Sequence, residues 1–400
     1  MIFDINFKGD IMGAIGGIVD FRGANIDFAG FNAIRGAQTL RGRKSSVAYC
    51  NNGVAMLYNS EGENECEQPI ISERGGYNTV ITIDASAFDA RRIVEAYRAY
   101  GVEFIGMLDF PFAIALYDEK RRVLLLARDK KGRKPLFYSV RAGRIVFSSE
   151  PKGILATEDK PIRINCEALS AHLSSPMGIY GAADIYSDLF ELRCGECILF
   201  SELGISKFFY REERSKRISA RIAQKLRLKP IEPDFTFDRE LITSSLDDAL
   251  VAFDIPQFDA YMPSVCRLLF NAEAGTRFQF ADHIKRYNIQ YSYEREDRLN
   301  AFYGKRAIGV IARFDDSLSA KYEEEKRRML EALTEAFFSL ERNEMLFLRE
   351  VIGDIKLNYI INNINGRIKK ENTEEYIRIL GMLYQAAKWQ RMRRLELIRS

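Results

Sequence analysis

The sequence predicts an α+β first half and a mostly helical second half. Short apolar runs separated by glycine and charged turn residues fill the first half, as in a sheet of antiparallel strands. One of these runs is apolar at every position, which is typical of a strand covered on both faces. Beyond about residue 236, apolar residues recur mostly at three- and four-residue steps, as on one face of a helix.

Five strands are expected in the first half. They cover residues 15–21, 112–118, 122–129, 135–140 and 144–149. Turn residues separate the last four, so we expect these four to form an antiparallel meander. The run from Phe112 to Tyr117 has no polar position, so the sheet should lie between helices or against a second sheet.

Helices are expected in both halves. Residues 89–101 place Ile93, Val94 and Tyr97 on one face, with Asp89 near the start and a glycine at the end. In the second half, the apolar residues at helical spacing are Tyr322, Met329, Leu330, Leu333, Phe337 and Leu340. Residues 372–375 resemble a capping box that opens a final helix through residue 389.

A strongly basic stretch after Tyr210 marks the expected domain boundary. We therefore divide the chain into a first domain of residues 1–210, a basic linker of residues 211–235 and a helical domain of residues 236–400. A prior of roughly 150 residues per domain also favours two domains in a chain of 400 residues.

Composition narrows the class of protein. The 59 basic residues nearly balance the 56 acidic ones, so no overall positive field points to nucleic acid. No apolar run of about 18 residues predicts a membrane span, and the first residues lack the basic and apolar regions of a signal peptide. We therefore expect a cytoplasmic protein that binds neither nucleic acid nor membrane.

One pair of cysteines has the spacing of a metal or redox site. Cys194 and Cys197 form a Cys-Gly-Glu-Cys segment, whereas the other four cysteines are scattered. A structural zinc site needs about four ligands, and the chain contains only two histidines. We interpret the segment as a turn flanked by buried thiols and expect no metal.

Residues 104–155 carry an ordered series of motifs. The sequence Phe-Ala-Ile-Ala-Leu-Tyr-Asp leads to Ala-Arg-Asp-Lys-Lys-Gly-Arg-Lys-Pro-Leu-Phe-Tyr, and Ser-Glu-Pro-Lys follows at residues 149–152. Together with Ile-Gly-Gly-Ile-Val-Asp-Phe at residues 15–21, this series resembles the asparagine synthetase family, whose first domain is a class II glutamine amidotransferase. The similarity covers about residues 15–210.

This resemblance implies a fold for each half. For the first domain it implies a four-layer αββα sandwich of the N-terminal-nucleophile amidotransferase type. For the second it implies a truncated, mostly α-helical relative of the ATP-pyrophosphatase synthetase domain.

The resemblance also implies where glutamine hydrolysis should occur. In the family, a cysteine that begins the mature chain is the nucleophile, and its own α-amino group is the base. Gly13 stands at this position, behind twelve further residues, so no catalytic residue is assigned. The family's Asn-Gly pair, which donates to the oxyanion, is replaced by a strand with Ile83 near the glycine position.

Residues for substrate recognition are only partly kept. Asn59 and Ser60 stand where the resemblance implies an arginine that holds the substrate carboxylate. Arg41, with Gly42, matches the family's Arg-Gly, and Asp89 matches an aspartate that binds the glutamine amino group. By resemblance, Arg41 and Asp89 are therefore the candidate ligand-binding residues, although an aspartate at a helix start is also a common N-cap.

The synthetase motifs are weaker. The family's Asp-x-Pro-x-x-Asp…Pro segment is matched by Asp254, Pro256, Asp259 and Pro263. Thr276 and Arg277 stand where an Asp-Glu pair is expected, and neither Gly-Gly pair, at residues 16–17 or 75–76, fits a phosphate-binding loop. The interval between Tyr210 and Asp254 is also too short for the missing nucleotide-binding strands. No cofactor is expected.

The charged turn after residue 127 is interpreted as scaffold. Its charged residues are Arg128, Asp129, Lys131, Arg133 and Lys134. We expect them to be exposed ion-pairing residues that hold a strand connection, where each pair contributes about 0–1 kcal/mol.

Three functions remain open at this point. The first is a non-catalytic relative of asparagine synthetase that binds a protein or peptide partner, or a small amino acid, in a pathway that forms amide bonds. The second is an ATP- and magnesium-dependent amide ligase of this family with a remodelled or partner-completed site. The third is a module whose basic tail binds an acidic partner, although a helix dipole also favours cations at a C-terminus. The basic residues of that tail are Lys388, Arg391, Arg393, Arg394 and Arg399.

Overall fold

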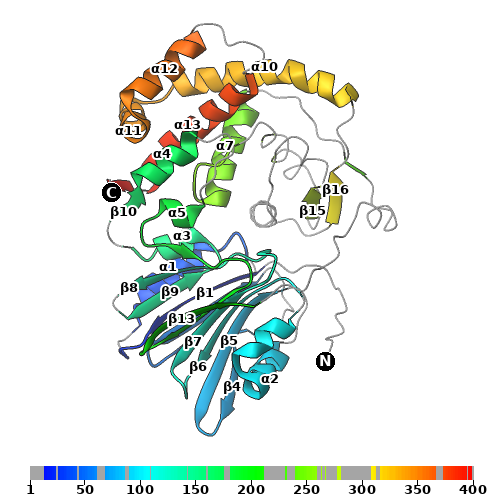
Figure 1. Ribbon diagram of the computed structural model, residues 1–400, viewed down its shortest axis with the longest axis vertical. Coiled ribbons are helices and arrows are strands. Elements are labelled where there is room, and N and C mark those ends of the chain that lie inside the picture. The colour runs from blue at the N-terminus through cyan, green and yellow to red at the C-terminus, as the bar shows by residue number, and fades with distance from the viewer. Residues whose placement is uncertain are drawn as a thin grey trace. The chain divides into compact units, whose positions relative to one another are not determined.

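The computed structural model describes most of the chain (Figure 1). The described residues are 13–23, 26–42, 45–60, 68–85, 90–108, 110–141, 143–158, 161–174, 181–210, 230–231, 239–258, 263, 266, 277–280, 308–311, 316–365, 373–393 and 395–398. Contacts divide the chain into two compact units. Unit 1 comprises residues 1–159 and 188–217, and unit 2 comprises residues 160–187 and 218–400.

This division corrects the expected boundary at residue 210. Residues 160–187 belong to unit 2, because β10 (Ile162–Asn165) pairs in parallel with β17 (Leu395–Ile398) near the other end of the chain. In addition, α4 (Cys166–Ser174) packs against α11 (Arg342–Ile352) and α13 (Thr373–Arg393). The chain therefore enters unit 2, returns to unit 1, and enters unit 2 again, which a single boundary does not capture.

Unit 1 contains two six-stranded antiparallel sheets. The first has the order β11 (Phe190–Glu191), β8 (Phe137–Arg141), β9 (Arg144–Ser148), β1 (Gly13–Asp20), β3 (Val54–Ser60) and β2 (Ser45–Asn51). The second has the order β13 (Gly204–Phe209), β12 (Glu196–Ser201), β7 (Val123–Arg128), β6 (Phe112–Asp118), β5 (Tyr77–Ala85) and β4 (Ile70–Arg74).

Helices cover the outer faces of the two sheets. On the first sheet lie α1 (Phe28–Ala37) and α3 (Pro151–Leu155), and on the second lie α2 (Ala90–Tyr100) and the 3-10 helix η1 (Gly101–Met107). Side chains of both sheets share one core, which includes Ile15 and Phe147 from the first sheet and Ala115 and Leu126 from the second. The layer order is therefore helix, sheet, sheet, helix (Figure 1).

The apolar strand β6 explains why the layers stack in this way. Its Ala113, Ala115 and Tyr117 lie in the core between the sheets, whereas its Ile114 and Leu116 lie in the core beneath α2 and η1. Apolar residues at successive positions thus supply both faces of one strand. The prediction that this strand is covered on both faces is confirmed.

The expected strands all exist, but the meander is wrong. β6 pairs with β7, and β8 pairs with β9, yet these two hairpins lie in different sheets. Residues 129–136 therefore carry the chain from one sheet to the other. Local turn signals predict that a chain reverses direction, but they do not reveal which sheet the next strand joins.

The described part of unit 2 is mostly helical, as predicted. Its longest helices are α7 (Arg239–Phe253), α10 (Asp316–Phe338), α13 and α12 (Asp354–Asn365), and α13 packs against α7 and α10. The predicted final helix corresponds to α13, although its expected N-cap at residue 372 lies outside the described residues. A short helix, α5 (Ala182–Ile185), completes the contacts around α4.

Unit 2 also contains a small parallel sheet that the sequence did not predict. Its order is β14 (Pro230–Ile231), β16 (Ile308–Ile311) and β15 (Arg277–Phe280). Strands of two to four residues carry too little periodicity to be detected from sequence. Within the part of the chain that the structure describes, no helix is long and apolar enough to cross a membrane.

Two glycines provide a matched test of the packing in unit 1. A Cβ atom on Gly17 would strike the backbone oxygen of Ala55 and would lie 2.6 Å from Cζ of Phe147, whereas a Cβ atom on Gly36 in α1 would meet nothing within 4 Å. We expect Gly17→Ala to lower the free energy of unfolding by about 1–3 kcal/mol, because a backbone oxygen cannot move aside. We expect Gly36→Ala to be neutral or to stabilise by about 0.5–1 kcal/mol. Urea denaturation of both variants measures the difference, and equal stability would contradict the described register.

Candidate functional site

The candidate site lies at the N-terminal end of β1. Gly13 pairs with Ser60 of β3 and, like the rest of β1, is buried. A Cβ atom on Gly13 would lie 2.6 Å from both Cε2 and the hydroxyl oxygen of Tyr58. Real Cβ atoms do not approach other heavy atoms this closely, so the Tyr58 ring occupies the space that a side chain at residue 13 needs.

A buried cluster of three charged residues lies at the same end of β1. Nη2 of Arg41 is 3.2 Å from Oδ2 of Asp84, and Nζ of Lys134 is 3.1 Å from Oδ1 of the same carboxylate. The three side chains are at most 1% exposed. In addition, Nε of Arg41 donates to the carbonyl oxygen of Gly13 at 3.2 Å, which connects the cluster to β1.

Three distant segments meet in this cluster. Arg41 follows α1, Asp84 lies near the end of β5, and Lys134 lies in the segment that joins the two sheets. Removing charges from water is costly, and a buried ion cluster persists only where opposite charges and hydrogen bonds offset that cost. Asp84 supplies the negative charge that both cations contact.

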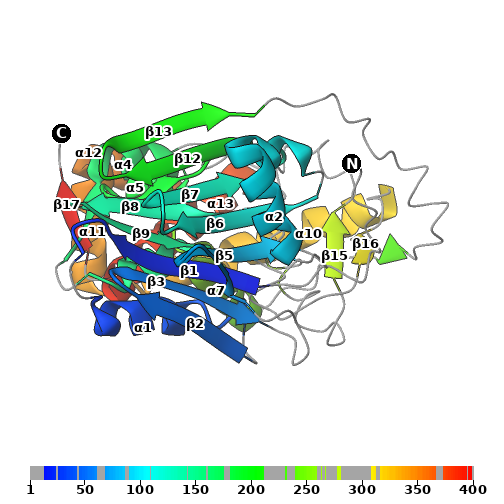
Figure 2. The same ribbon diagram turned by 90° about the horizontal axis from the view of Figure 1, so that it is seen from below.

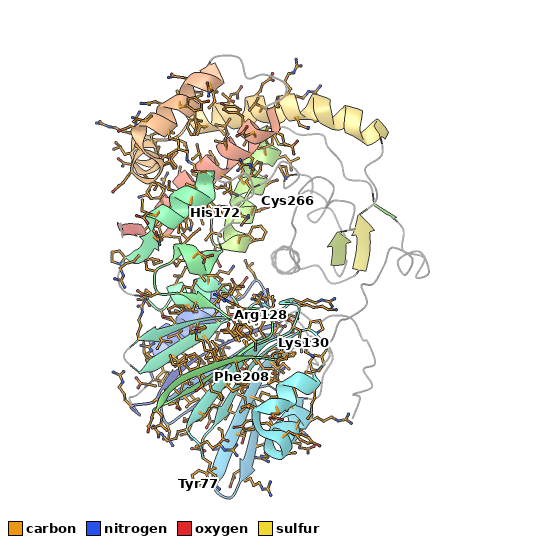
Figure 3. The ribbon with its side chains drawn as sticks, viewed as in Figure 1. Tyr77, Arg128, Lys130, His172, Phe208 and Cys266 are labelled. Carbon is orange, nitrogen blue, oxygen red and sulfur yellow. The ribbon has the colours of Figure 1, made fainter. Side chains whose placement is uncertain are left out.

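Three charged residues of the crossover turn, Arg128, Asp129 and Lys134, are buried, which corrects the expectation of exposed ion pairs at these positions. Arg128 is 3% exposed and donates to Oε1 of Glu191 at 2.6 Å, to the carbonyl oxygen of Leu192 at 2.6 Å and to that of Gly132 at 2.8 Å (Figure 3). Asp129 is 4% exposed and accepts from the backbone nitrogen of Lys134 at 3.1 Å. In the same turn, Lys131 is exposed and Arg133 is half-buried, so the expectation of exposed charges holds for Lys131 alone.

The backbone of Ile83 is fully engaged by one side chain. Its N–H donates to Oε1 of Gln68 at 2.7 Å, and its carbonyl oxygen accepts from Nε2 of Gln68 at 3.1 Å. Both residues are buried. An amide N–H that already donates at 2.7 Å to a fixed acceptor is not available to a developing oxyanion.

Asn59 and Ser60, which stand where a carboxylate-binding arginine was sought, are buried structural residues. Asn59 is 1% exposed, and its Nδ2 donates to the carbonyl oxygen of Arg35 in α1 at 3.1 Å. A Cβ atom on Gly42 would strike the backbone of Asn59, so this position requires glycine. Asn59 thus ties α1 to β3.

The structure therefore brings together only some of the predicted site residues. Arg41 contacts the carbonyl oxygen of Gly13, whereas Asp89 lies outside the described residues. The residues that the sequence reasoning missed are Tyr58, Gln68 and Asp84, and Lys134 was interpreted only as part of an exposed turn. A charged residue next to the apolar run before Ala85 was the available signal for Asp84, whereas Tyr58 and Gln68 carried none.

The two neighbouring cysteines do not form a shared site. Cys194 is exposed, whereas Cys197 is buried in β12, so the expectation of two buried thiols is only half right. Burial raises the pKa of the Cys197 thiol and keeps it protonated. Within the described residues there is no group of three or more histidine, cysteine, aspartate or glutamate side chains that could hold a metal.

In unit 2, the segment after α7 is fixed by buried hydrogen bonds. Asp254 has a positive φ of 64° and is fully buried, and its Oδ1 accepts from Nη2 of Arg393 at 2.7 Å. Its carbonyl oxygen accepts from the hydroxyl of Tyr186 at 2.6 Å and from Nε1 of Trp389 at 3.1 Å. Asp254 therefore joins α5 and α13 to the end of α7.

The next residues of this segment are bound in the same way. The carbonyl oxygen of Pro256 lies 2.7 Å from Nε2 of His172, which is on α4 (Figure 3). The backbone N–H of Gln257 donates to Oε1 of Gln385 at 2.7 Å. Asp259 lies outside the described residues, so the predicted pair of aspartates in this motif stays a prediction.

Two further sequence interpretations can be compared with the structure. Gly16 and Gly17 lie inside β1, and Gly75 and Gly76 form the β4–β5 turn with φ angles of 63° and 79°, so neither pair is a phosphate loop that opens a helix.

In the basic tail, Lys388 lies 3.0 Å from Glu344, Arg391 lies 3.1 Å from Glu341, and Arg393 pairs with Asp254. Arg394 and Arg399 lie outside the described residues.

Part of the chain is similar to known proteins. Residues 36–211 match the glutamine amidotransferase domain family. This part of the chain is similar to asparagine synthetases. It is 30% identical over 129 residues to asparagine synthetase (glutamine-hydrolyzing) 3 of Bacillus subtilis, which covers 32% of this chain and 21% of that relative. It is 26% identical over 163 residues to putative asparagine synthetase (glutamine-hydrolyzing) 2 of Methanocaldococcus jannaschii, which covers 40% of this chain and 30% of that relative.

These matches concern a part of each relative. The chain spans less than a third of the length of the two asparagine synthetases. Among solved structures, an allosteric regulatory enzyme of purine biosynthesis matches 77% of this chain and 69% of its own, at 11% identity and a TM-score of 0.36.

The charge cluster allows a direct test by mutation. We expect Asp84→Ala to lower the free energy of unfolding by about 3–5 kcal/mol, because Arg41 and Lys134 lose the buried carboxylate that both contact. The double variant Asp84→Ala with Lys134→Met should lose less than Asp84→Ala alone, because one buried charge is removed with its partner. The control is Glu331→Gln in the exposed Arg327–Glu331 pair, which should change stability by less than about 0.5 kcal/mol. If Asp84→Ala were as mild as this control, the cluster would not be a buried ion network.

Proposed function

We propose that this chain is an asparagine synthetase-like protein whose amidotransferase domain no longer hydrolyses glutamine. It acts as a non-catalytic binding or partner subunit in a pathway that forms amide bonds. The observation that carries this proposal is the position of Tyr58, whose ring fills the side-chain space at Gly13.

The first argument concerns the nucleophile. Hydrolysis of glutamine by this class of domain requires a thiol at the start of β1 and a free α-amino group as its base. Glycine supplies no thiol, and residue 13 of this chain is joined to residue 12 by an amide, whose nitrogen is not a base. A side chain on this residue would also require the buried Tyr58 ring to move.

The second argument concerns transition-state charge. A preorganised N–H donor is worth about 3–4 kcal/mol to an acyl-transfer reaction, but only if it points at the oxyanion. The N–H of Ile83 donates to Gln68 instead. The position that the resemblance assigns to oxyanion stabilisation is therefore used for structure.

The third argument concerns the substrate itself. A guanidinium that binds a ligand must be able to reach it, yet Arg41, the candidate ligand-binding arginine, is fully buried and lies against Asp84 and the carbonyl oxygen of Gly13. The Asp84 carboxylate therefore already pairs with the Arg41 guanidinium, in the place that the carboxylate of a bound ligand would take. Asp89 remains a candidate contact for an amino-acid ligand by resemblance only.

The domain nevertheless keeps a continuous core. Both sheets, their shared interior and the outer helices are present, with large side chains such as Phe112, Phe137 and Phe147 at most 1% exposed. A scaffold of this kind presents a rigid surface, which suits a protein or peptide partner. We extend this proposal to the cytoplasm as the compartment, where the thiols Cys50 and Cys194 would stay reduced.

Glutamine hydrolysis provides the test. The full chain, incubated with L-glutamine, should form no glutamate above the uncatalysed background in a coupled glutamate dehydrogenase assay. Gly13→Cys should gain nothing, because the new side chain would collide with Tyr58 and would still lack a free α-amine. An intact glutamine-hydrolysing asparagine synthetase is the positive control. Glutamate formation that scales with the concentration of wild-type chain and is lost on heating would contradict the proposal.

The second candidate function is an ATP-dependent amide ligase of the same family that uses a remodelled or partner-completed site. The observation in its favour is the parallel sheet of β14, β16 and β15, because parallel strands are characteristic of α/β nucleotide-binding folds. This candidate would require ATP and magnesium as cofactors, and its acceptor would be an amine or free ammonia.

Nucleotide binding and exchange separate the two candidates. Under our proposal, ATP with magnesium leaves the thermal unfolding of the full chain unchanged, and no label moves from pyrophosphate into ATP. A ligase that binds ATP would instead be stabilised by about 2.7 kcal/mol at an ATP concentration of 100 times Kd. Exchange in the presence of any carboxylic acid substrate would overturn the non-catalytic function and establish the alternative.

A further inference from the structure

The edge strand β13 is the most exposed strand of unit 1. It pairs with β12 on one side and has no neighbour on the other within the described residues (Figure 2). Five of its six residues are exposed and the sixth is half-buried. In an antiparallel edge strand, alternate N–H and C=O groups point outward without a partner strand.

The register shows which face each side chain of β13 occupies. Ile205 lies opposite Phe200, which belongs to the core between the sheets, and Lys207 contacts Tyr138 of the same core. Phe208 lies opposite Cys197 and packs on the other core, beneath the outer helices. Because side chains alternate along a strand, Phe209 shares the inner face with Ile205 and Lys207.

The core between the sheets is open along this edge. Ile205 is 48% exposed and Phe209 is 57% exposed, although both lie on the inner face of the second sheet. The facing edge strand of the first sheet, β11, has only two residues, so it covers little. Its Phe190 is 46% exposed and stacks on Tyr138 with ring centroids 5.3 Å apart. Three large apolar side chains thus border an unpaired strand edge.

The opposite edge of the same sheet is protected differently. β4 carries Glu73 and Arg74, and charged residues at an edge oppose the addition of another strand. β13 carries one charge, Lys207, and its ammonium is folded over the Tyr138 ring at 5.5 Å and donates to the Tyr138 hydroxyl at 2.8 Å. The edge of β13 therefore lacks the usual obstacle to strand addition.

Charge indicates what kind of strand fits. The sequence that follows β13, residues 211–229, contains eight lysine and arginine residues and two glutamates. A second copy of the chain would bring an equally basic segment to the edge and would be repelled. An acidic segment would be attracted.

We propose that β13 is a docking edge for an acidic, extended segment of a partner protein, which adds to the second sheet as an extra strand. The added strand completes the outward hydrogen bonds of β13 and covers Ile205, Phe209 and Phe190 with every second side chain. This inference deepens the proposed role as a partner subunit and rests on it, because it names the surface and the chemistry of the partner.

The probe is a fluorescein-labelled ten-residue peptide of alternating valine and glutamate. The full wild-type chain should bind it in a fluorescence anisotropy titration, and a peptide of alternating valine and lysine should bind at least tenfold more weakly. Ile205→Lys should weaken binding of the acidic peptide at least tenfold despite its added positive charge, because it removes an apolar contact. The matched control is Ile71→Lys on β4, where the isoleucine is 53% exposed, and this variant should bind like wild type.

Hydrogen exchange locates the bound strand. Amides of residues 204–209 should gain protection when the acidic peptide is added, and those of residues 70–74 should not. Equal loss of binding in Ile205→Lys and Ile71→Lys, absence of binding, or protection confined to other residues would overturn the proposal. So would self-association of the chain that Ile205→Lys abolishes, or full protection of residues 204–209 without peptide, since these results identify a second copy or another segment of this chain as the occupant.

The outcomes also separate this inference from the function on which it rests. A chain that hydrolyses glutamine yet binds the acidic peptide at β13 would overturn the non-catalytic role and leave the docking edge in place. A chain that is inactive on glutamine and also fails to bind the peptide would overturn the docking edge alone.

Discussion

The Asp84 carboxylate, held between Arg41 and Lys134, is the interaction on which unit 1 depends most. It joins the end of α1, the end of β5 and the segment that crosses between the sheets, and Arg41 extends the cluster to the first residue of β1. All three charges are removed from water, so the carboxylate must stay in place for either cation to remain buried. This requirement explains why Lys134, at the end of a stretch rich in lysine and arginine, is buried. Two buried cations could otherwise bind an anionic ligand. Here the Asp84 carboxylate of the protein itself occupies the position of such a ligand.

The surrounding packing follows the same logic. Tyr58 lies over Gly13, Gln68 engages both backbone groups of Ile83, and Gly42 allows close approach to the backbone of Asn59. Each contact fills space or satisfies a buried polar group. Native proteins retain local strain and open polar groups mainly at functional sites. The close packing at this end of β1 therefore agrees with a domain that is kept as a scaffold. The edge of β13, by contrast, has no partner strand within the described residues.

Sequence alone predicted the parts of this structure that depend on local patterns. β6 was found because each position from Phe112 to Tyr117 is apolar, and α2 was found because Ile93, Val94 and Tyr97 fall on one helical face. The crossover between sheets was missed because a turn motif does not reveal where the next strand pairs. Burial of Lys134 was missed because its partner, Asp84, lies fifty residues earlier and no local rule connects them. Likewise, the assignment of residues 160–187 to unit 2 depends on β17, at the far end of the chain.

The central claim is that this chain carries its own carboxylate and its own ring where glutamine would bind. A crystal structure of the full chain, grown with a large excess of L-glutamine, tests this claim most directly. The account predicts Asp84 between Arg41 and Lys134, the Tyr58 ring over Gly13, and no glutamine at the N-terminal end of β1. Density for glutamine with its carboxylate on Arg41, together with displacement of Asp84 or Tyr58, would contradict it.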